Sequence, residues 1–276
     1  FSSQDGILYN KAKSVLLTYP SGKTDSSYIF SDSVEYIMSD AFYSCSNLTD
    51  ITLSESVVSI AHDSFRGCSN LQSIKVDSKN DKFSSQDGIL YNKDKSELLI
   101  YPVGKKGDVF IIPNGVTSIG KYAFDSCTEL ASISIPNGVI SIGEGAFFYC
   151  SKLNHTVIPS SVKSVGYNAF SNCKSLEFAK FMGEKPIDLN KWAFSHNSNK
   201  FKILYPKIYE KSWNTYNACP KQSYGKVSVA GILIREKMLT LAKGKSRQIK
   251  YDITPYNADN KSVKWVSSNM KVATVS

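Results

Sequence analysis

The chain has 276 residues, of which 42% are hydrophobic and 21% are charged, both ordinary values for a globular protein. No run of about 18 or more apolar residues occurs, which excludes a predicted membrane-spanning helix. The net charge is +9, but residues 1–222 contribute +2 and residues 223–276 contribute +7. This basic C-terminal segment carries no recognisable nucleic-acid-binding motif, so we interpret it as a solvated face rather than a nucleic-acid footprint.

The first 23 residues are repeated later in the chain. FSSQDGILYNKAKSVLLTYPSGK (1–23) matches FSSQDGILYNKDKSELLIYPVGK (83–105) at 19 of 23 positions. Within the second copy, GILYNKDKSELLIYP predicts two strands joined by a turn at residues 93–96. We expect an inserted β-hairpin that serves as a structural module, and a chain cut from a longer precursor. The four differing pairs are expected mostly to face outward: Ala12/Asp94, Val15/Glu97, Thr18/Ile100 and Ser21/Val103.

A shorter repeat of about 23 residues is marked by phenylalanines at 42, 65, 124, 147, 170 and 194. Each of the first five is followed three residues later by a cysteine and six residues later by a leucine. Each is also preceded by Ile or Val at two fixed positions. The long step between the second and third phenylalanines is one unit plus 36 residues, which include the second hairpin. The cysteines in phase are Cys45, Cys68, Cys127, Cys150 and Cys173.

The sequence of each unit predicts one short strand and one helical turn. LASISIP (130–136) alternates apolar and polar residues, and the following Asn137-Gly138 supplies a turn. GEGAFFYCSKL (143–153) suits a single helical turn packed on the next unit. The period lies in the leucine-rich-repeat range, and stacked units bury a continuous core. We expect an α/β leucine-rich-repeat solenoid with a concave parallel sheet, short convex helical turns and inserted β-hairpins.

The solenoid is predicted to cover residues 1–222. KFKILYP (200–206) can form a last strand. Tyr209, Trp213 and Tyr216 then fall at i, i+4 and i+7, which predicts a helix with one apolar stripe. A capping helix near 208–218 would cover the open end of the core.

Residues 225–276 predict a second domain made of short strands. The alternating segments KMLTLAKG, RQIKYDITP, SVKWVSSN and VATVS are separated by turns. This pattern favours an all-β Ig-like sandwich. About 50 residues make only half of one, so we expect an incomplete sandwich whose remainder is missing or supplied by another chain.

No catalytic, cofactor or metal site is predicted. The five in-phase cysteines favour buried free thiols, since parallel side chains are poor disulfide geometry, although their proximity alone would allow bridges. The histidines share no metal-ligand spacing and are expected in loops or at the surface. Asp77, Asn80, Asp81 and Asp87 miss the EF-hand pattern, which favours a polar loop over a calcium site. The GKS at 244–246 lacks the first glycine of a phosphate loop.

A binding surface is expected on the concave strands, where the residues between the apolar ones point to solvent. Phe178 either anchors a partner or is covered by the following unit. The hairpin tyrosines Tyr9, Tyr91 and Tyr101 either form a second binding surface or pack against the solenoid. The concave candidates are Asp50, Thr52, Ser73, Lys75, Ser132, Ser134, His155, Val157, Phe178 and Lys180.

IPNGVTSIGKYAFDSCTELASISIPNGVISIGEGAF (112–147) resembles the BspA-like leucine-rich repeats of bacterial surface proteins. The resemblance covers roughly residues 1–218, while residues 225–276 resemble the first part of a bacterial Ig-like group 2 domain. It implies a secreted or surface-attached bacterial protein, with partners such as fibronectin, fibrinogen or other cells, and no shared catalytic residues. Two departures concern the last units: Thr156 replaces an apolar strand residue, and Asn197 stands at the cysteine position.

Two functions fit this sequence. The first is a non-enzymatic adhesin that binds an extracellular protein or glycan without a cofactor, nucleic acid or inserted membrane segment. The second is a scaffold or targeting region of a larger secreted enzyme. The full open reading frame and a binding assay would discriminate between them.

Overall fold

The computed structural model describes residues 1–224, 231–234 and 251–254. It divides into two units, Phe1–Ser223 and Tyr224–Ser276. In the second unit β22 (Gly231–Ile234) pairs antiparallel with β23 (Tyr251–Thr254). The rest of the predicted Ig-like sandwich, with its predicted incompleteness, lies outside the described residues.

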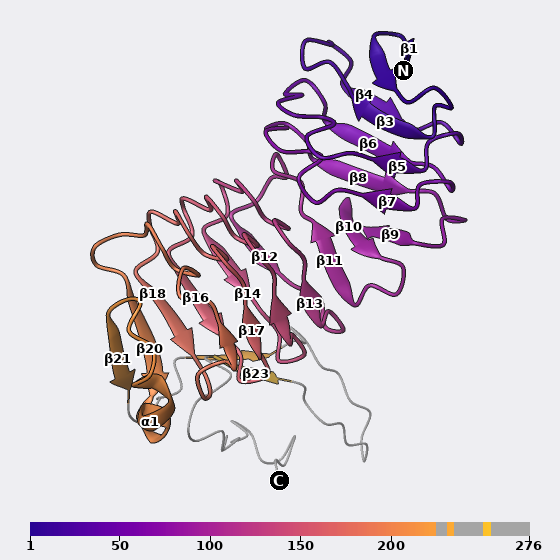
Figure 1. The fold of residues 1–276 in the computed structure, drawn as a ribbon. Coiled ribbons are helices and arrows are strands. Elements are labelled where there is room, and N and C mark those ends of the chain that lie inside the picture. The colour runs from indigo at the N-terminus through magenta and orange to yellow at the C-terminus, as the bar shows by residue number, and fades with distance from the viewer. Residues whose placement is uncertain (225–230, 235–250, 255–276) are drawn as a thin grey trace, which may run out of the picture. The chain divides into compact units, whose positions relative to one another are not determined.

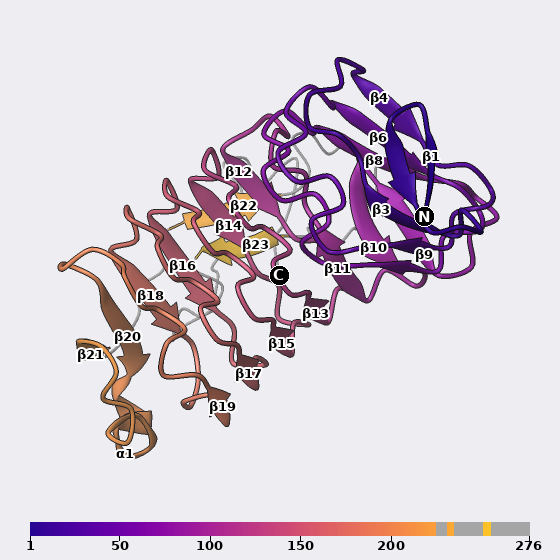
Figure 2. The ribbon, with the colours of Figure 1, turned by 45° about the horizontal axis from the view of Figure 1, so that its top comes forward.

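A typical repeat of the first unit contributes one long and one short strand, and on each side of the second module both pair in parallel with the same strands of the neighbouring turns (Figures 1 and 2). The long strands follow the cysteine position or, for the first and fourth of them, a hairpin module: β4 (Ser27–Ile29), β6 (Asp50–Leu53), β8 (Ser73–Val76), β12 (Val109–Ile111), β14 (Ser132–Ser134), β16 (His155–Ile158), β18 (Phe178–Phe181) and β20 (Lys202–Pro206). The short ones come from the V-x-S-I stretch: β5 (Tyr36–Ile37), β7 (Ser59–Ile60), β13 (Ser118–Ile119), β15 (Ser141–Ile142), β17 (Ser164–Val165) and β19 (Asp188–Leu189).

The predicted convex helical turns are wrong, because the AF-containing segments are chains of tight turns without α-helix. In residues 143–153, Gly145 and Tyr149 have φ values of 57° and 58°, and a left-handed residue every fourth position interrupts a right-handed helix. The N–H groups instead donate to the next turn of the solenoid. Those of Gly145, Phe147 and Tyr149 reach the carbonyls of Tyr167, Ala169 and Ser171 at 2.9, 2.7 and 3.1 Å.

The core is a stack of aromatic rings along the solenoid. Phe147 is fully buried, and its ring centroid lies 4.9 Å from that of Phe124 and 4.8 Å from that of Phe170. The hairpin module supplies a tyrosine at the same place, because Tyr101 stacks on Phe124 at 5.0 Å. Offset stacking of this kind adds to the stabilisation that burial gives.

The five in-phase cysteines are buried free thiols, as predicted. Each also satisfies a backbone carbonyl of the preceding turn: the Cys150 and Cys173 thiols donate to the carbonyls of Phe124 and Phe147 at 3.1 Å. Burial raises the pKa of the Cys173 thiol to about 12. At the irregular last turn the Asn197 side-chain N–H donates to the Phe170 carbonyl at 2.9 Å. Asn197 therefore replaces cysteine without leaving that carbonyl unpaired.

The predicted hairpin is confirmed and gains a third strand from FSSQ. The second copy consists of β9 (Phe83–Gln86), β10 (Ile89–Asn92) and β11 (Glu97–Ile100), with the predicted turn at 93–96. The first copy consists of β1 (Ser2–Gln4), β2 (Ile7–Tyr9) and β3 (Val15–Thr18). Strands β3 and β11 pair in parallel with β5 and β13. Each module therefore ends as a strand of the solenoid itself.

The second module separates two hydrophobic cores. Leu90 and Ile100 pack in the core that precedes it, whereas Ile89 and Tyr91 pack in the core that follows it. The sheet of long strands accordingly stops at β8 and starts again at β12. The outward placement expected for Ile100 is wrong, because the side chain is only 8% exposed. It closes the first core, a role its counterpart Thr18 does not have.

The cap begins with a 3-10 turn (Lys207–Tyr209) and α1 (Glu210–Trp213), so the helix is much shorter than the predicted 208–218. Residues 214–217, NTYN, have low helix propensity, which explains the early end. Trp213 is fully buried, and its indole N–H donates to the Gly183 carbonyl at 3.2 Å. β21 (Lys221–Tyr224) is the last strand of the long-strand sheet. No helix of the described residues has the length and apolar character needed to cross a membrane.

Candidate functional site

The ten predicted surface residues lie on two sheets rather than one. Asp50, Thr52, Ser73 and Lys75 belong to β6 and β8, ahead of the second module. The other six belong to β14, β16 and β18, behind it: Ser132, Ser134, His155, Val157, Phe178 and Lys180. The module interrupts the sheet between the two groups. We name the group on β6 and β8 the first strand face and the group on β14, β16 and β18 the second strand face.

The second strand face presents an aromatic pair. His155 and Phe178 are direct partners in the ladder, and their rings stack with centroids 5.4 Å apart and planes 21° apart. Ser132 precedes the pair and Lys202 follows it in the same row of the sheet. His155 is exposed and Phe178 half-buried, so the following strand covers Phe178 only in part. This face offers a flat aromatic surface on a rigid backbone.

The first strand face is polar and internally paired. The Lys75 ammonium lies 3.7 Å from the Asp50 carboxylate, and their side chains are 65% and 41% exposed. Such a pair contributes at most about 1 kcal/mol and leaves little net charge. The apolar Ile29 at the neighbouring edge strand β4 is 71% exposed. None of its four residues is aromatic, so the first strand face lacks a pair like His155–Phe178 of the second strand face.

The acidic loop before the second module is structural. Asn80 is fully buried, and its side-chain N–H groups donate to the Ser54 and Val57 carbonyls at 2.9 Å. Its side-chain oxygen accepts from the N–H groups of Lys82 and Phe83. In the described part of the chain, no three His, Cys, Asp or Glu residues gather as metal ligands would. These contacts favour the polar-loop interpretation.

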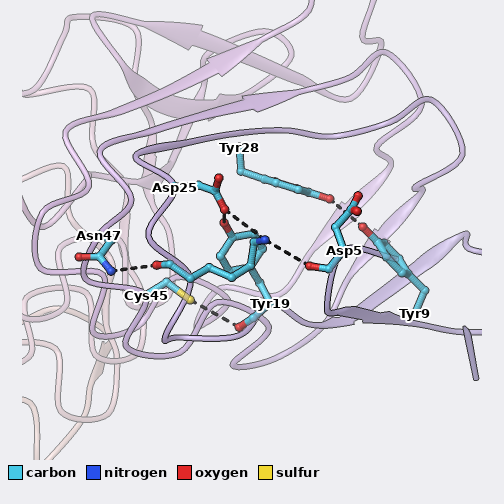
Figure 3. A network of polar contacts seen from close by, with 8 residues as sticks. Asp5, Tyr9, Tyr19, Asp25, Tyr28, Cys45 and Asn47 are labelled. Carbon is cyan, nitrogen blue, oxygen red and sulfur yellow. Dashed lines mark hydrogen bonds and ion pairs between the residues drawn. The ribbon is translucent and has the colours of Figure 1, made fainter. Parts of the chain in front are cut away.

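The hairpin tyrosines pack inward, which supports the second of the two alternatives. Tyr9, Tyr91 and Tyr101 are 6%, 1% and 5% exposed. In the first module the Tyr9 hydroxyl shares a 2.9 Å hydrogen bond with the Tyr28 hydroxyl (Figure 3). Burial is the main cause that raises the pKa of Tyr28 above its usual range. These phenols anchor the module and are not available to a ligand.

A neighbouring polar network fixes the loop that follows the first module (Figure 3). The Tyr19 hydroxyl donates to Asp25 at 3.2 Å, and the Lys23 ammonium lies 3.2 Å from the same carboxylate. Hydrogen bonds from Lys23 and Tyr19 lower the pKa of Asp25. Lys23 also donates to the Asp5 carbonyl at 3.2 Å. The network joins the tip of the module to the solenoid.

The sequence analysis missed a cavity at the C-terminal end of the solenoid. It has a volume of about 400 Å³ and lies between the turn of residues 191–199 and the segment 216–220. Trp192, which is 50% exposed, forms part of its wall. One signal was available: the residue two before the ladder phenylalanine is Asp40, Asp63, Tyr122, Gly145 or Asn168 in the other turns and a tryptophan here.

The protein-family model described as the BspA type leucine rich repeat region matches residues 22–94 and 106–221, in six copies. The chain belongs to this family of BspA-type leucine-rich repeats. Residues 228–276 match the bacterial Ig-like domain of group 2. The family explains why the repeat frame is carried by Phe, Cys, Leu and Ile at fixed positions, since those are the buried positions of each turn.

Two solved structures resemble the BspA-type chain at comparable levels. A leucine-rich repeat protein from Eubacterium ventriosum is 25% identical with a TM-score of 0.58, covering 72% of this chain and 54% of the other. A leucine-rich cell surface protein from Faecalibacterium prausnitzii is 29% identical with a TM-score of 0.57, covering 72% and 53%. The chain thus spans about half the length of each. A search of curated proteins gave no match.

Proposed function

We propose that this chain is a non-enzymatic, adhesin-like binding module that acts outside a bacterial cell. The observation that carries the proposal is the stacked His155–Phe178 pair on the second strand face. Half-exposed aromatic side chains on a rigid backbone are typical anchors of interfaces, because they bury a large area at a small cost in conformational entropy. The cell-surface description of the Faecalibacterium relative supports the location.

The charges around the pair favour an extracellular protein or glycan that offers an apolar or aromatic group together with an acceptor for lysine. Lys180 lies beside Val157 in the ladder, and Lys202 lies beside Phe178. Interface energy concentrates in the central anchor, while rim charges mainly steer association. Phe178 is therefore expected to account for more affinity than either lysine.

The test is binding of the full 276-residue chain to immobilised matrix proteins, including fibronectin and fibrinogen, and to a glycan array. We expect a saturable signal that survives about 0.5 M salt, where exposed charge attraction is screened. Phe178→Ala should weaken binding by about tenfold or more. Ile29→Ala, an apolar truncation on the first strand face, is the matched control and should leave binding unchanged.

Loss of the signal at high salt, or an equal effect of both variants, would contradict the assignment to the second strand face. Absence of any signal would contradict the adhesin-like role. It would favour the alternative of a scaffold or targeting region of a larger secreted enzyme, for which the full open reading frame would have to contain a catalytic domain.

A further inference from the structure

The cavity at the C-terminal end of the solenoid has the dimensions and walls of a small-ligand site. Its volume of about 400 Å³ lies in the usual range of roughly 300–1,000 Å³. The last AF-containing turn forms one wall and the cap segment, with Tyr216 and Cys219, forms the other. None of the strand-face residues lines it.

Two backbone N–H groups at this cavity lack an acceptor among the described residues. The ladder of hydrogen bonds that joins each AF-containing turn to the next ends there. In the turn before, the N–H groups of Phe170 and Asn172 donate to the carbonyls of Ala193 and Ser195 at 2.7 and 3.1 Å. The equivalent donors of the last turn are Phe194 and His196, which both line the cavity. Within the described residues, neither N–H has an acceptor.

The columns of the AF-containing segments, which end at this cavity, also place partial positive charge at their last N–H groups. Successive peptide groups in each column point the same way, carbonyl toward the N-terminal end and N–H toward the cavity. Their dipoles add as those of a helix do, which leaves partial positive charge at the last N–H groups. Among the described residues that line the cavity, Lys191 is cationic and none is an Asp or a Glu. An anionic group is therefore the favoured occupant.

Trp192 indicates what else the ligand carries. Its indole is half exposed, and the Lys191 ammonium lies 5.4 Å from the ring centroid. The negative face of an aromatic ring attracts the polarised C–H groups on one face of a pyranose ring. A flat apolar platform beside anion donors thus fits a sugar with a negative charge.

We propose that this cavity binds a sugar that carries a carboxylate. The carboxylate accepts hydrogen bonds from the Phe194 and His196 N–H groups, and the ring packs on Trp192. The inference does not depend on the second strand face. It names a second site, with its own ligand class, whose residues are separate from Phe178.

A cavity at the corresponding end of the earlier column provides an internal comparison. In that column the Phe42 and Ser44 N–H groups donate to the Ser64 and Arg66 carbonyls, and the column stops at Gly67, next to a cavity of about 660 Å³. Among the described residues, two lysines and two carboxylates line that cavity, Lys105, Lys106, Asp108 and Glu129, and no aromatic side chain does. The charges there offset one another and the aromatic platform is missing, so the proposal applies to the C-terminal cavity alone.

The test is calorimetric titration of the full chain with glucuronate, N-acetylneuraminate, glucose and acetate. We expect one acidic sugar or both to bind at one site, with glucose and acetate about tenfold weaker or more, because each lacks one of the two recognition elements. Trp192→Ala should lower the affinity for the acidic sugar by about tenfold or more. Trp192→Phe keeps a flat ring and should lower it by much less. Tyr43→Ala removes a similarly exposed aromatic of an early turn and should have no effect.

Equal affinity for glucose and glucuronate, or no binding of either acidic sugar, would overturn the proposal. So would equal losses in Trp192→Ala and Tyr43→Ala. Phe178→Ala is expected to leave this titration unchanged, and Trp192→Ala to leave binding at the second strand face unchanged. The two proposals can therefore fail separately.

Discussion

At the scale of single residues, polar groups inside the solenoid are paired with few exceptions. Asn197 and the cysteines each donate to a ladder carbonyl of the preceding turn. Thr156 on β16 differs, because its side chain is fully buried and its hydroxyl has no partner in the described structure. A buried hydroxyl without a partner costs free energy that an apolar group of the same shape does not.

Thr156→Val is therefore expected to stabilise the protein by about 1 kcal/mol, since the methyl group replaces an unpaired hydroxyl of similar size. The measurement is the urea midpoint of the variant against the unmodified chain. Thr49→Val is the control, because the Thr49 hydroxyl donates to the Ser26 carbonyl at 3.0 Å and its loss should not stabilise. An unchanged or lowered midpoint for Thr156→Val would contradict the argument.

The thiols should react in two classes. Cys219 is half-buried, and burial raises its pKa to about 11, whereas the five ladder cysteines are buried. Native iodoacetamide labelling should occur at Cys219 alone, and its rate should rise about tenfold per pH unit between pH 7 and 10, because only the thiolate reacts. Cys219→Ser should abolish it, and urea should expose the rest. Rapid native labelling of Cys150 would show that the ladder is open.

At the scale of elements, the repeated module serves as a partition between two cores. β10 sends Leu90 to one side and Ile89 and Tyr91 to the other, which is the alternation of a strand. The Ile74 N–H on β8 donates to the Gly88 carbonyl at 2.8 Å, so the module also covers the sheet edge that ends there. In the first module the counterpart of Leu90 is Leu8, which is 37% exposed.

This difference gives a matched pair of truncations. Leu90→Ala should destabilise the protein by about 2–5 kcal/mol, because it leaves a cavity between two cores. Leu8→Ala removes the same atoms from a partly exposed site and should cost clearly less. Urea unfolding of both variants is the measurement. Equal losses would mean that the second module does not depend on its contact with the preceding core.

At the scale of the whole molecule, the solenoid is held by columns that run through successive turns: stacked rings, thiols and backbone hydrogen bonds. Each column must end somewhere. Trp213 and Tyr216 cover the apolar columns at the C-terminal end, while the N–H column ends at the cavity beside Trp192. The same periodicity that builds the core thus also produces the proposed ligand site.

The buried thiols make this architecture sensitive to alkaline pH. Burial raises the pKa of Cys127 and Cys150, and that of Cys173 to about 12, whereas an unfolded thiol titrates near about 8.5. The unfolded state then loses protons first. The thiol contribution to stability should be constant below about pH 8.5 and fall above it by up to about 1.4 kcal/mol per pH unit and thiol.

Urea midpoints measured from pH 7 to about 10 check this slope. Most of this pH range lies below the pKa of unfolded tyrosine, so tyrosine ionisation adds little to the slope. A variant with Cys127, Cys150 and Cys173 replaced by alanine should start from a lower stability and show a flatter profile. A constant midpoint in the unmodified chain would contradict the buried, protonated state of the thiols.

Much of the fold follows from local pattern. The 23-residue phase identifies the buried positions, since Phe, Cys, Leu and Ile recur wherever a turn faces the core. The turn at 93–96 follows from the residues around it. The predicted helical turns were wrong because their residue types suit either a helix or a left-handed turn. Bonds to the neighbouring turns decide between the two, and sequence pattern does not contain them.

The sequence by itself determined that this protein is a repeat solenoid with a repeated inserted module, because a fixed period can bury its apolar face only by stacking. Only the tertiary structure decided that Tyr101 starts a new aromatic stack, that Leu90 and Ile89 serve different cores, and that four of the ten surface residues lie apart from the other six. The C-terminal cavity, too, was decided only by the tertiary structure. It depends on where the columns stop, and that position is fixed by packing between segments distant in sequence.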